Sequence, residues 1–173
     1  DSGGFQVLSL IAGSPKSGGV TKDGFTYRLG RDDRKILTPE KCVQKQFQLG
    51  ADVMFCLDHC THPGDGPERQ RESVAHTLAW ARRCKGEFQR RLDQRPPPGR
   101  PPLLFAVIQG GEDRDLRRRC AEELLEVGFD GYGFGGWPID PDGRLLDTVG
   151  FVADLLPPSC PKHALGVGKP DNL

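Results

Sequence analysis

The feature that most constrains the fold is a repeated alternation between short apolar runs and longer amphipathic stretches. The run LLFAVIQ at 103–109 is apolar up to its last residue, which is typical of a strand buried on both faces of a sheet. The stretch 112–128 then carries apolar side chains at helical spacing and ends at Gly128. Because a crossover helix joins neighbouring parallel strands, this alternation predicts an α/β fold around a parallel sheet.

The same unit occurs elsewhere in the chain. Thr38 and Pro39 predict the start of a helix that buries Leu49 before Gly50 ends it. Further strands are predicted at 51–60, 129–136 and 163–168, and further helices at about 68–92 and 145–156. The proline-rich segment 95–102 is predicted to be a stiff linker within one domain.

Polar residues and glycines recur where the predicted strands end. They are Asp58, Gln109, Gly135, Gly136, Gly166 and Gly168. Such residues are typical of the active-site face of a (β/α)8 TIM barrel, which we therefore favour over an open doubly wound sheet. Eight βα units need about 200 residues or more, and only four or five are visible here. We expect residues 1–173 to be one domain, the central part of a barrel that is incomplete in this chain.

Composition narrows the classes of function. The formal net charge is +0, so no overall basic charge favours nucleic acid. Two arginine-rich segments, 82–91 and 114–119, are interpreted as solvated helix faces, with a phosphate-binding stripe as the alternative. No apolar run is long enough for a signal peptide or a bilayer span, so we expect a soluble, cytoplasmic protein with no membrane partner.

The 6 cysteines are scattered, and none forms a C-x-x-C pair. We expect free and mostly buried thiols. Cys56, His59, Cys60 and His62 lie close together in sequence, and a zinc site there is the alternative. We predict no metal ligand among the residues of this chain.

Asp1, Asp58 and Gln109 are the polar residues that we place in one pocket. A carboxylate at the end of a strand, among apolar neighbours, can have a raised pKa and exchange protons near neutrality. Together the three offer acceptors for ring N–H and amino groups and a donor for a ring carbonyl, a set that suits a planar heterocycle such as guanine. The alternative is that Asp58 caps a loop and Gln109 braces it.

The glycines near these residues extend the hypothesis. Phe5 follows two glycines that allow close approach to a ligand, and its ring could stack on a flat base, although Phe is more often a core residue. Gly135 and Gly136 predict a tight turn, bare amides facing a ligand carbonyl, or both. Neither glycine-rich nucleotide-binding motif is present, and no hydrolase nucleophile elbow occurs.

Five motifs taken in order are more specific than any one of them. They are DSGGFQ, LGADVMFCLDHC, VIQGG, FDGYGFGGW and LGVGKPDN. In order and spacing this set resembles the tRNA-guanine transglycosylase (queuine tRNA-ribosyltransferase) family over nearly the whole chain. The resemblance implies a (β/α)8 barrel that exchanges a guanine in a tRNA anticodon loop for a 7-deazaguanine, queuine or its precursor, in queuosine biosynthesis.

The resemblance also implies roles for individual residues. Asp1 resembles the acid/base carboxylate beside the bound base, with Ser2 at the pocket floor. Phe5 resembles the aromatic residue that stacks on the base, and Leu165 lies where a Met usually closes the other face. The reaction would proceed through an oxocarbenium-like state and a covalent ribosyl-enzyme intermediate, as in a retaining glycosidase. The base must leave its stack, which costs little in a single-stranded loop.

Recognition of the purine is implied at the other motifs. Asp58 and Gln109 resemble the carboxylate and amide that read the base, and the Gly136 amide and Trp137 carbonyl resemble the backbone groups that complete recognition. The predicted substrate-binding residues are Ser2, Phe5, Asp58, Gln109, Gly135, Gly136, Trp137, Leu165 and Gly166, and the predicted catalytic residue is Asp1.

Some family features have no counterpart in the sequence. The nucleophilic Asp and the Cys/Cys/Cys/His zinc site lie downstream of the LGVG strand, so we expect zinc only in the full-length protein and expect this segment alone to be inactive. The stretch GGWPIDPDG replaces the small-residue loop that senses the 7-substituent. The alternatives are a non-catalytic paralogue or partner subunit that binds base or tRNA, and an enzyme that inserts a deazaguanine into DNA. A homodimer or a paralogous partner is expected by resemblance.

Overall fold

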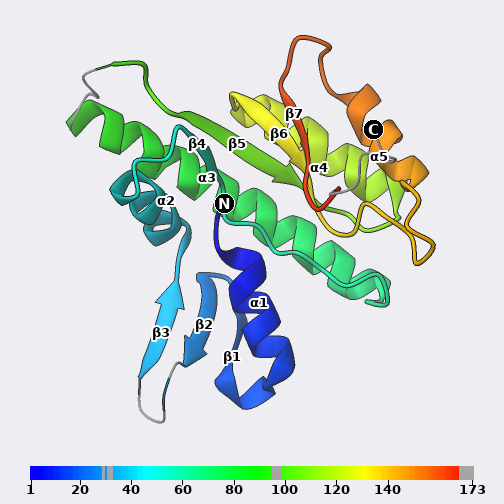
Figure 1. Cartoon of the computed structure of the whole chain (residues 1–173), viewed down its shortest axis with the longest axis horizontal. Helices are drawn as coiled ribbons and strands as arrows, with labels where there is room; N and C mark the ends of the chain where they lie inside the picture. The colour runs from blue at the N-terminus through cyan, green and yellow to red at the C-terminus, as the bar shows by residue number, and fades with distance from the viewer. Residues whose placement is uncertain (29, 31–32, 95–98, 168–173) are drawn as a thin grey trace.

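The structure is a computed structural model that describes residues 1–28, 30, 33–94 and 99–167. It contains two sheets, one parallel with the strand order β4-β5-β6-β7 and one antiparallel with the order β1-β2-β3. Figure 1 shows the antiparallel strands and α1 together at one end of the molecule, with the parallel sheet and the longer helices beyond them. The sequence predicted the parallel sheet and did not predict the antiparallel one.

The parallel sheet consists of β4 (Val53–Phe55), β5 (Leu103–Ile108), β6 (Gly131–Phe134) and β7 (Lys162–Ala164). Its order follows the chain without reversal, and β4 and β7 are its edges, so the described strands form an open sheet and no closed barrel. In β5, Leu104, Ala106 and Ile108 lie in the core with the helices, whereas Phe105 and Val107 alternate toward the opposite face. Burial on both faces confirms the interpretation of the apolar run.

The helices that alternate with these strands pack against one another in chain order, and the first of them precedes β4. They are α2 (Pro39–Gln48), α3 (Pro67–Gln94), α4 (Arg114–Val127) and α5 (Asp147–Leu155). Thr38 is the N-cap of α2, where its hydroxyl accepts from Lys41 N at 3.2 Å, as predicted. The prediction that Leu49 is buried is wrong, because its side chain is 83% exposed at the C-cap. No helix among the described residues combines the length and apolarity that a membrane span requires.

Two predicted strands are longer than the observed ones. The strand predicted at 51–60 ends at Phe55. Cys56 N still donates to Phe105 O of β5 at 2.8 Å, but two N–H groups beyond it turn to α3: Leu57 N donates to Cys84 Sγ and His59 N to Thr77 Oγ1. The strand predicted at 163–168 is β7, after which 165–166 form a turn. Gly168 and residues 95–98 of the predicted linker lie outside the described residues.

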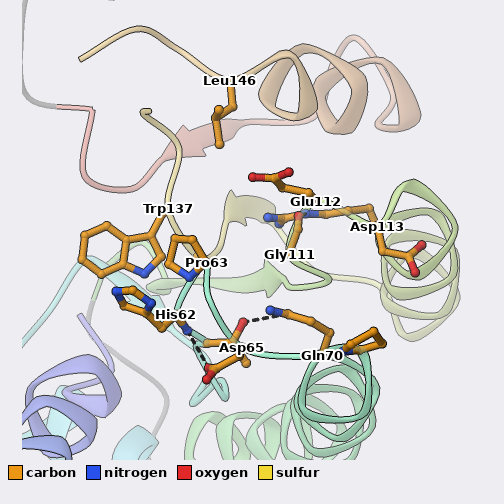
Figure 2. A pocket seen from close by; sticks show the side chains of 13 residues that line it. His62, Pro63, Asp65, Gln70, Gly111, Glu112, Asp113, Trp137 and Leu146 are labelled. Carbon is orange, nitrogen blue, oxygen red and sulfur yellow. Dashed lines mark hydrogen bonds between the residues drawn. The ribbon is translucent and has the colours of Figure 1, made fainter. Parts of the chain in front are cut away.

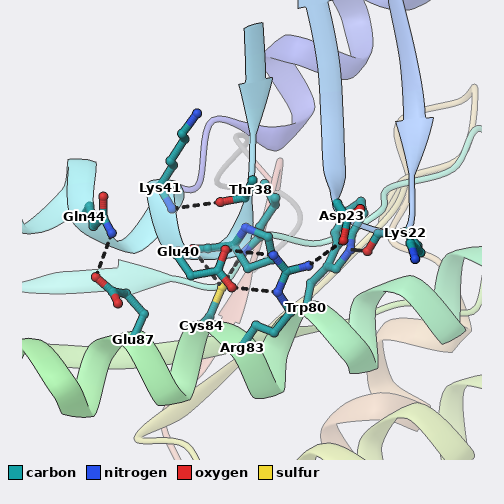
Figure 3. Close-up of polar contacts among 12 residues, drawn as sticks. Lys22, Asp23, Thr38, Glu40, Lys41, Gln44, Trp80, Arg83, Cys84 and Glu87 are labelled. Carbon is teal, nitrogen blue, oxygen red and sulfur yellow. Dashed lines mark hydrogen bonds and ion pairs between the residues drawn. The ribbon is translucent and has the colours of Figure 1, made fainter.

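The amino-terminal part was not predicted beyond its first motif. It consists of α1 (Gly4–Gly13), a short 3-10 turn (Pro15–Ser17), β1 (Gly18–Thr21), β2 (Gly24–Arg28) and β3 (Arg34–Leu37). Figure 3 shows how the turn between β1 and β2 is tied to the helices: Trp80 Nε1 donates to Lys22 O at 2.9 Å, and Arg83 lies 3.6 Å from Asp23. Arg83 also forms a two-pronged ion pair with Glu40 of α2. Arg83 of α3 therefore contacts both α2 and the turn between β1 and β2. The expectation that segment 82–91 is only a solvated helix face is wrong at this residue.

Candidate functional site

A cavity of about 330 Å³ lies at the carboxyl ends of the parallel strands, next to the first turn of α1. Its lining residues are Asp1, Ser2, Phe5, Gln6, Phe55, Asp58, Cys60, Val107, Gly135, Gly136, Trp137, Pro138, Ile139, Leu165 and Gly166. Nine of the ten predicted site residues are therefore around one cavity, and the tenth, Gln109, is hydrogen bonded to Asp58. The structure brings together residues that are as far apart in sequence as Asp1 and Gly166.

Asp58 and Gln109 form a hydrogen-bonded pair at the cavity. Gln109 is fully buried at the end of β5, and its Nε2 donates to Asp58 Oδ2 at 2.6 Å. Burial raises the pKa of Asp58 from 3.8 to about 6, although the hydrogen bond from Gln109 acts in the opposite direction. The Oε1 atom of Gln109 is buried and accepts no hydrogen bond within the described part of the chain. The Asp58 carboxylate lines the cavity, so the pair presents a charged acceptor to a ligand that carries N–H donors.

The raised pKa of Asp58 predicts an unusual dependence of stability on pH. The folded protein holds this proton more tightly than the unfolded chain, so between pH 3.8 and about 6 stability falls as pH rises. In chemical denaturation from pH 4 to pH 7, we expect the wild-type free energy of unfolding to fall by roughly 2 kcal/mol relative to Asp58→Asn. Parallel curves for the two proteins would contradict the assignment.

The opening motif forms two local turns at the rim of the cavity. Asp1 Oδ1 accepts from Gly3 N at 3.3 Å, and Asp1 Oδ2 accepts from Gln6 Nε2 at 2.9 Å. Gly3 has a φ of 75°, which other residues rarely adopt. The Phe5 side chain is 52% exposed, so it is not a core residue, and its ring is accessible from the cavity. This geometry is compatible with the predicted stacking role.

Gly135 and Gly136 follow β6, and the structure favours glycine at each position for a different reason. A Cβ on Gly135 would lie 2.4 Å from Gln109 Nε2 and 2.7 Å from Val107 Cγ1, so a side chain would displace the amide that holds Asp58. Gly136 has a φ of 85°, a backbone conformation that favours glycine, and it directly precedes Trp137. Both predicted functions of this pair, a turn and a bare backbone at the cavity, are compatible with its geometry.

Replacement of Gly135 tests the close packing against Gln109. We expect Gly135→Ala to lower the free energy of unfolding by about 1–3 kcal/mol, because the added methyl overpacks a rigid site. Gly150→Ala on α5 is the matched control: nothing lies within 4 Å of its added Cβ, and a stabilisation of up to about 1 kcal/mol is expected. Urea denaturation of both variants measures the difference. Equal effects would show that Gln109 moves aside at little cost.

The remaining wall is a small hairpin. Ile139 and Leu145 form an isolated antiparallel bridge, and Asp140 N donates to Arg144 O at 2.9 Å. Trp137 begins this hairpin with a side chain that is 42% exposed. The predicted residues Leu165 and Gly166 line the cavity from the turn after β7.

A second cavity of about 220 Å³ lies beyond Gly136 and Trp137, which line both cavities. Figure 2 shows its aromatic and acidic lining, with the Trp137 ring close to His62. Asp65 Oδ2 accepts from His62 N at 2.8 Å and so fixes the loop after β4. The sequence did not predict this cavity, because its walls are the first turns of α3 and α4 and loops whose signals are scattered Pro, Gly and Asp residues.

Cys60 and Arg117 are two residues near the site whose roles were not predicted. Burial and the neighbouring Asp58 raise the pKa of Cys60 to about 12, so it remains a thiol and is a poor nucleophile. Arg117 was placed on a solvated helix face, but its side chain is buried behind the glycine loop. Arg117 is one of several arginines on α4, and the sequence alone does not distinguish the buried arginine from the exposed ones.

The sequence alternative of a zinc site does not fit the local geometry. His59 is fully buried, its Nδ1 lies 3.2 Å from His76 Nδ1, and burial lowers its pKa to about 4. Across residues 1–28, 30, 33–94 and 99–167, no three His, Cys, Asp or Glu side chains are arranged to hold a metal ion. As predicted, the thiols are free, and four of them are buried.

The fold and the cavity define a class of protein. It is an α/β protein with a ligand pocket at the carboxyl ends of parallel strands, where buried polar groups can read a small planar molecule. The family model described as queuine tRNA-ribosyltransferase matches residues 1–173, and the chain belongs to that family.

Curated relatives agree with this membership. Proteins named queuine tRNA-ribosyltransferase from Psychrobacter cryohalolentis, Solidesulfovibrio magneticus and Halothermothrix orenii are 37%, 39% and 38% identical to the chain. Each alignment covers 100% of this chain and 43%, 44% and 43% of the respective relative. The chain thus spans less than half the length of the relatives that it matches.

Proposed function

We propose that the protein is a tRNA-guanine transglycosylase, a pentosyltransferase that replaces a guanine in a tRNA anticodon loop by a 7-deazaguanine, queuine or its precursor. Membership of the family supports this proposal. The observation that carries it is the cavity in which Asp1, the Asp58–Gln109 pair and the Gly135–Gly136 backbone meet. Its volume of about 330 Å³ is in the range of small-molecule pockets.

The donors and acceptors of the cavity complement guanine. The Asp58 carboxylate accepts from the ring N–H and the amino group, while Gln109 holds that carboxylate in place. The Gly136 N–H donates to the ring carbonyl, and the Trp137 carbonyl faces the 7-position of a deazaguanine. Phe5 stacks on one face of the base and Leu165 covers the other.

Asp1 acts as the general acid and base in the proposed exchange. When the glycosidic C–N bond breaks, Asp1 delivers a proton to the departing guanine, and it accepts a proton from the incoming deazaguanine when the new C–N bond forms. Gln6 and the Gly3 N–H hold its carboxylate at the rim of the cavity. Between the two steps the ribose is carried by a nucleophilic carboxylate of the enzyme, which we do not assign to a residue of this chain.

The proposal extends to the longer protein. The chain-order arrangement of the four parallel strands, which lacks the reversal of a doubly wound sheet, supports a (β/α)8 barrel as the complete fold. Zinc, which the family resemblance implies, would be held by residues outside this chain, since the described residues do not fit a zinc site. We further propose a cytoplasmic enzyme that acts as a homodimer or with a paralogous subunit.

Exchange of radiolabelled guanine into unmodified tRNA tests the function. The full-length protein is expected to incorporate label into tRNA and to release it again when unlabelled queuine or its precursor is added. A DNA duplex in place of tRNA is the control. Label in DNA alone would support a DNA-modifying enzyme instead, and binding of base or tRNA without exchange would support a non-catalytic partner subunit.

A further inference from the structure

Arg117 is a buried cation with an unusual set of partners. Its side chain is 1% exposed on the first turns of α4. Within the described part of the chain it forms no ion pair, and its guanidinium donates to three backbone carbonyls instead. Nη1 donates to Ile108 O at 2.7 Å and to Gly135 O at 2.9 Å, and Nε donates to Gly111 O at 2.8 Å.

The surroundings of Arg117 keep it in one position. Its guanidinium lies over the Phe134 ring, 4.0 Å from the centroid. A Cβ on Gly110 would lie 2.8 Å from Arg117 N, so the glycine after Gln109 allows this close approach. Burial lowers the pKa of Arg117 to about 10, and the side chain is still a cation at neutral pH. A buried charge without a carboxylate is costly, and folding stability alone gives no reason to keep one here.

One of the three acceptors belongs to the loop that faces the base. The peptide bond between Gly135 and Gly136 is planar and trans, so its carbonyl and its N–H point in opposite directions. Because Arg117 holds the Gly135 carbonyl on the helix side, the Gly136 N–H is directed to the other side, where Cys60 and the 330 Å³ cavity lie. Consistent with this direction, the Gly136 N–H is close enough to stabilise a Cys60 thiolate, although burial dominates the pKa of that thiol.

This N–H is available to a ligand. No backbone carbonyl of the described residues accepts a hydrogen bond from Gly136 N, and the Cys60 sulfur beside it is only a weak acceptor that a ligand carbonyl can replace. The hydrogen bond from a guanidinium to the carbonyl of the same peptide also polarises that peptide, which strengthens its N–H as a donor.

From these contacts we infer that Arg117 is a positioning residue for base recognition, which holds the Gly136 N–H directed at the ring carbonyl of the purine. The inference rests on the proposed function, since it takes guanine as the ligand. Arg117 does not touch the base itself. It acts through one peptide plane, and its effect is therefore confined to ligands that carry the carbonyl.

The test compares two purines in the full-length protein. Guanine has the ring carbonyl and the adjacent ring N–H, whereas 2-aminopurine keeps the 2-amino group and lacks both. Each purine is compared with itself between variant and wild type, so the missing ring N–H, which faces Asp58, does not enter the fold change. We expect Arg117→Met to weaken guanine about tenfold and 2-aminopurine less than about threefold, because one peptide hydrogen bond is lost only for guanine. Arg117→Lys keeps a buried cation without the fork of donors, and an intermediate loss of about threefold is expected for guanine. Equilibrium dialysis with radiolabelled guanine and titration of 2-aminopurine fluorescence give the dissociation constants.

The ratio of the two affinities separates positioning from a general structural role. Arg118→Met is the control, because Arg118 is on the same helix and pairs with Asp115 at the surface. An equal loss for both purines, or no loss for either, would overturn the inference. If Arg117→Met does not fold, Arg117→Lys decides: a lower guanine preference supports the inference and an unchanged one overturns it. A wild-type protein that binds no guanine would overturn the proposed function, and the inference with it.

Discussion

Asp58→Asn is expected to weaken guanine binding by about 100-fold. The carboxylate accepts from Gln109 Nε2 at 2.6 Å and can accept from the base at the same time. In the variant, the asparagine oxygen can satisfy Gln109, but its NH2 group then faces the donors of the purine. Loss of a charged acceptor with a donor left unpaired costs about 2–3 kcal/mol, which corresponds to this loss of affinity.

Equilibrium dialysis with radiolabelled guanine measures this loss in the full-length protein. Asp65→Asn is the matched control, because Asp65 lines the second cavity and accepts from His62 N rather than facing the base. We expect less than about threefold change for it. If Asp58→Asn binds guanine as tightly as the wild type, Asp58 only caps its loop and the pocket assignment is wrong.

Asp1→Ala is expected to reduce the rate of base exchange by about 10²–10⁴-fold, the usual contribution of general acid–base catalysis. Its carboxylate is exposed, and its contacts with the Gly3 N–H and Gln6 are local, so the fold should not change. Guanine affinity should remain within about threefold of the wild-type value. The loss should therefore appear in the turnover rate and not in base binding.

Initial rates of guanine exchange into tRNA measure this effect. Asp1→Asn is the informative companion, because it keeps the hydrogen-bonding shape of the carboxylate but cannot transfer the proton, and the same loss is expected. Asp154→Ala, an exposed position on α5, is the control and should exchange at the wild-type rate. Substantial turnover in Asp1→Ala would show that the opening motif is structural.

The parallel part of the fold was predictable because its signals are local. Burial of β5 on both faces and the Thr38 N-cap both appear as short patterns in the sequence. The end of β4 was not predictable from hydrophobicity. Leu57 is as buried as a strand residue, but its N–H bonds to Cys84 on α3, a long-range contact that leaves no periodic pattern. The predicted strand was therefore too long by the residues that lead into the site.

The antiparallel sheet was missed for a related reason. β1 and β3 are each 4 residues long, rich in Gly, Thr, Lys and Arg, and carry little alternation of apolar and polar side chains. Phe25 of β2 is fully buried and contacts Trp80 edge-on, and Trp80 lies far along the chain on α3. Tertiary packing, not local propensity, stabilises this sheet.

The candidate site was predictable to the extent that strand ends converge. Asp58, Gln109 and Gly136 each follow a parallel strand, so topology alone brings them to one edge of the sheet. Arg117 could not be found in this way, because it reaches the same loops from the first turns of a helix whose other arginines face solvent. A side chain directed toward the N-terminal end of its helix is a matter of rotamer and packing, which sequence spacing does not show.

The two tryptophans of the chain lie in different environments, so their fluorescence can report unfolding and pocket occupancy separately. Trp80 is fully buried and stacked on His76, so its emission should be blue-shifted and should follow unfolding. Trp137 is 42% exposed where the two cavities meet, so its emission should be red-shifted and sensitive to a purine beside it. Excitation at the red edge of the indole band would thus report occupancy of the pocket without a label.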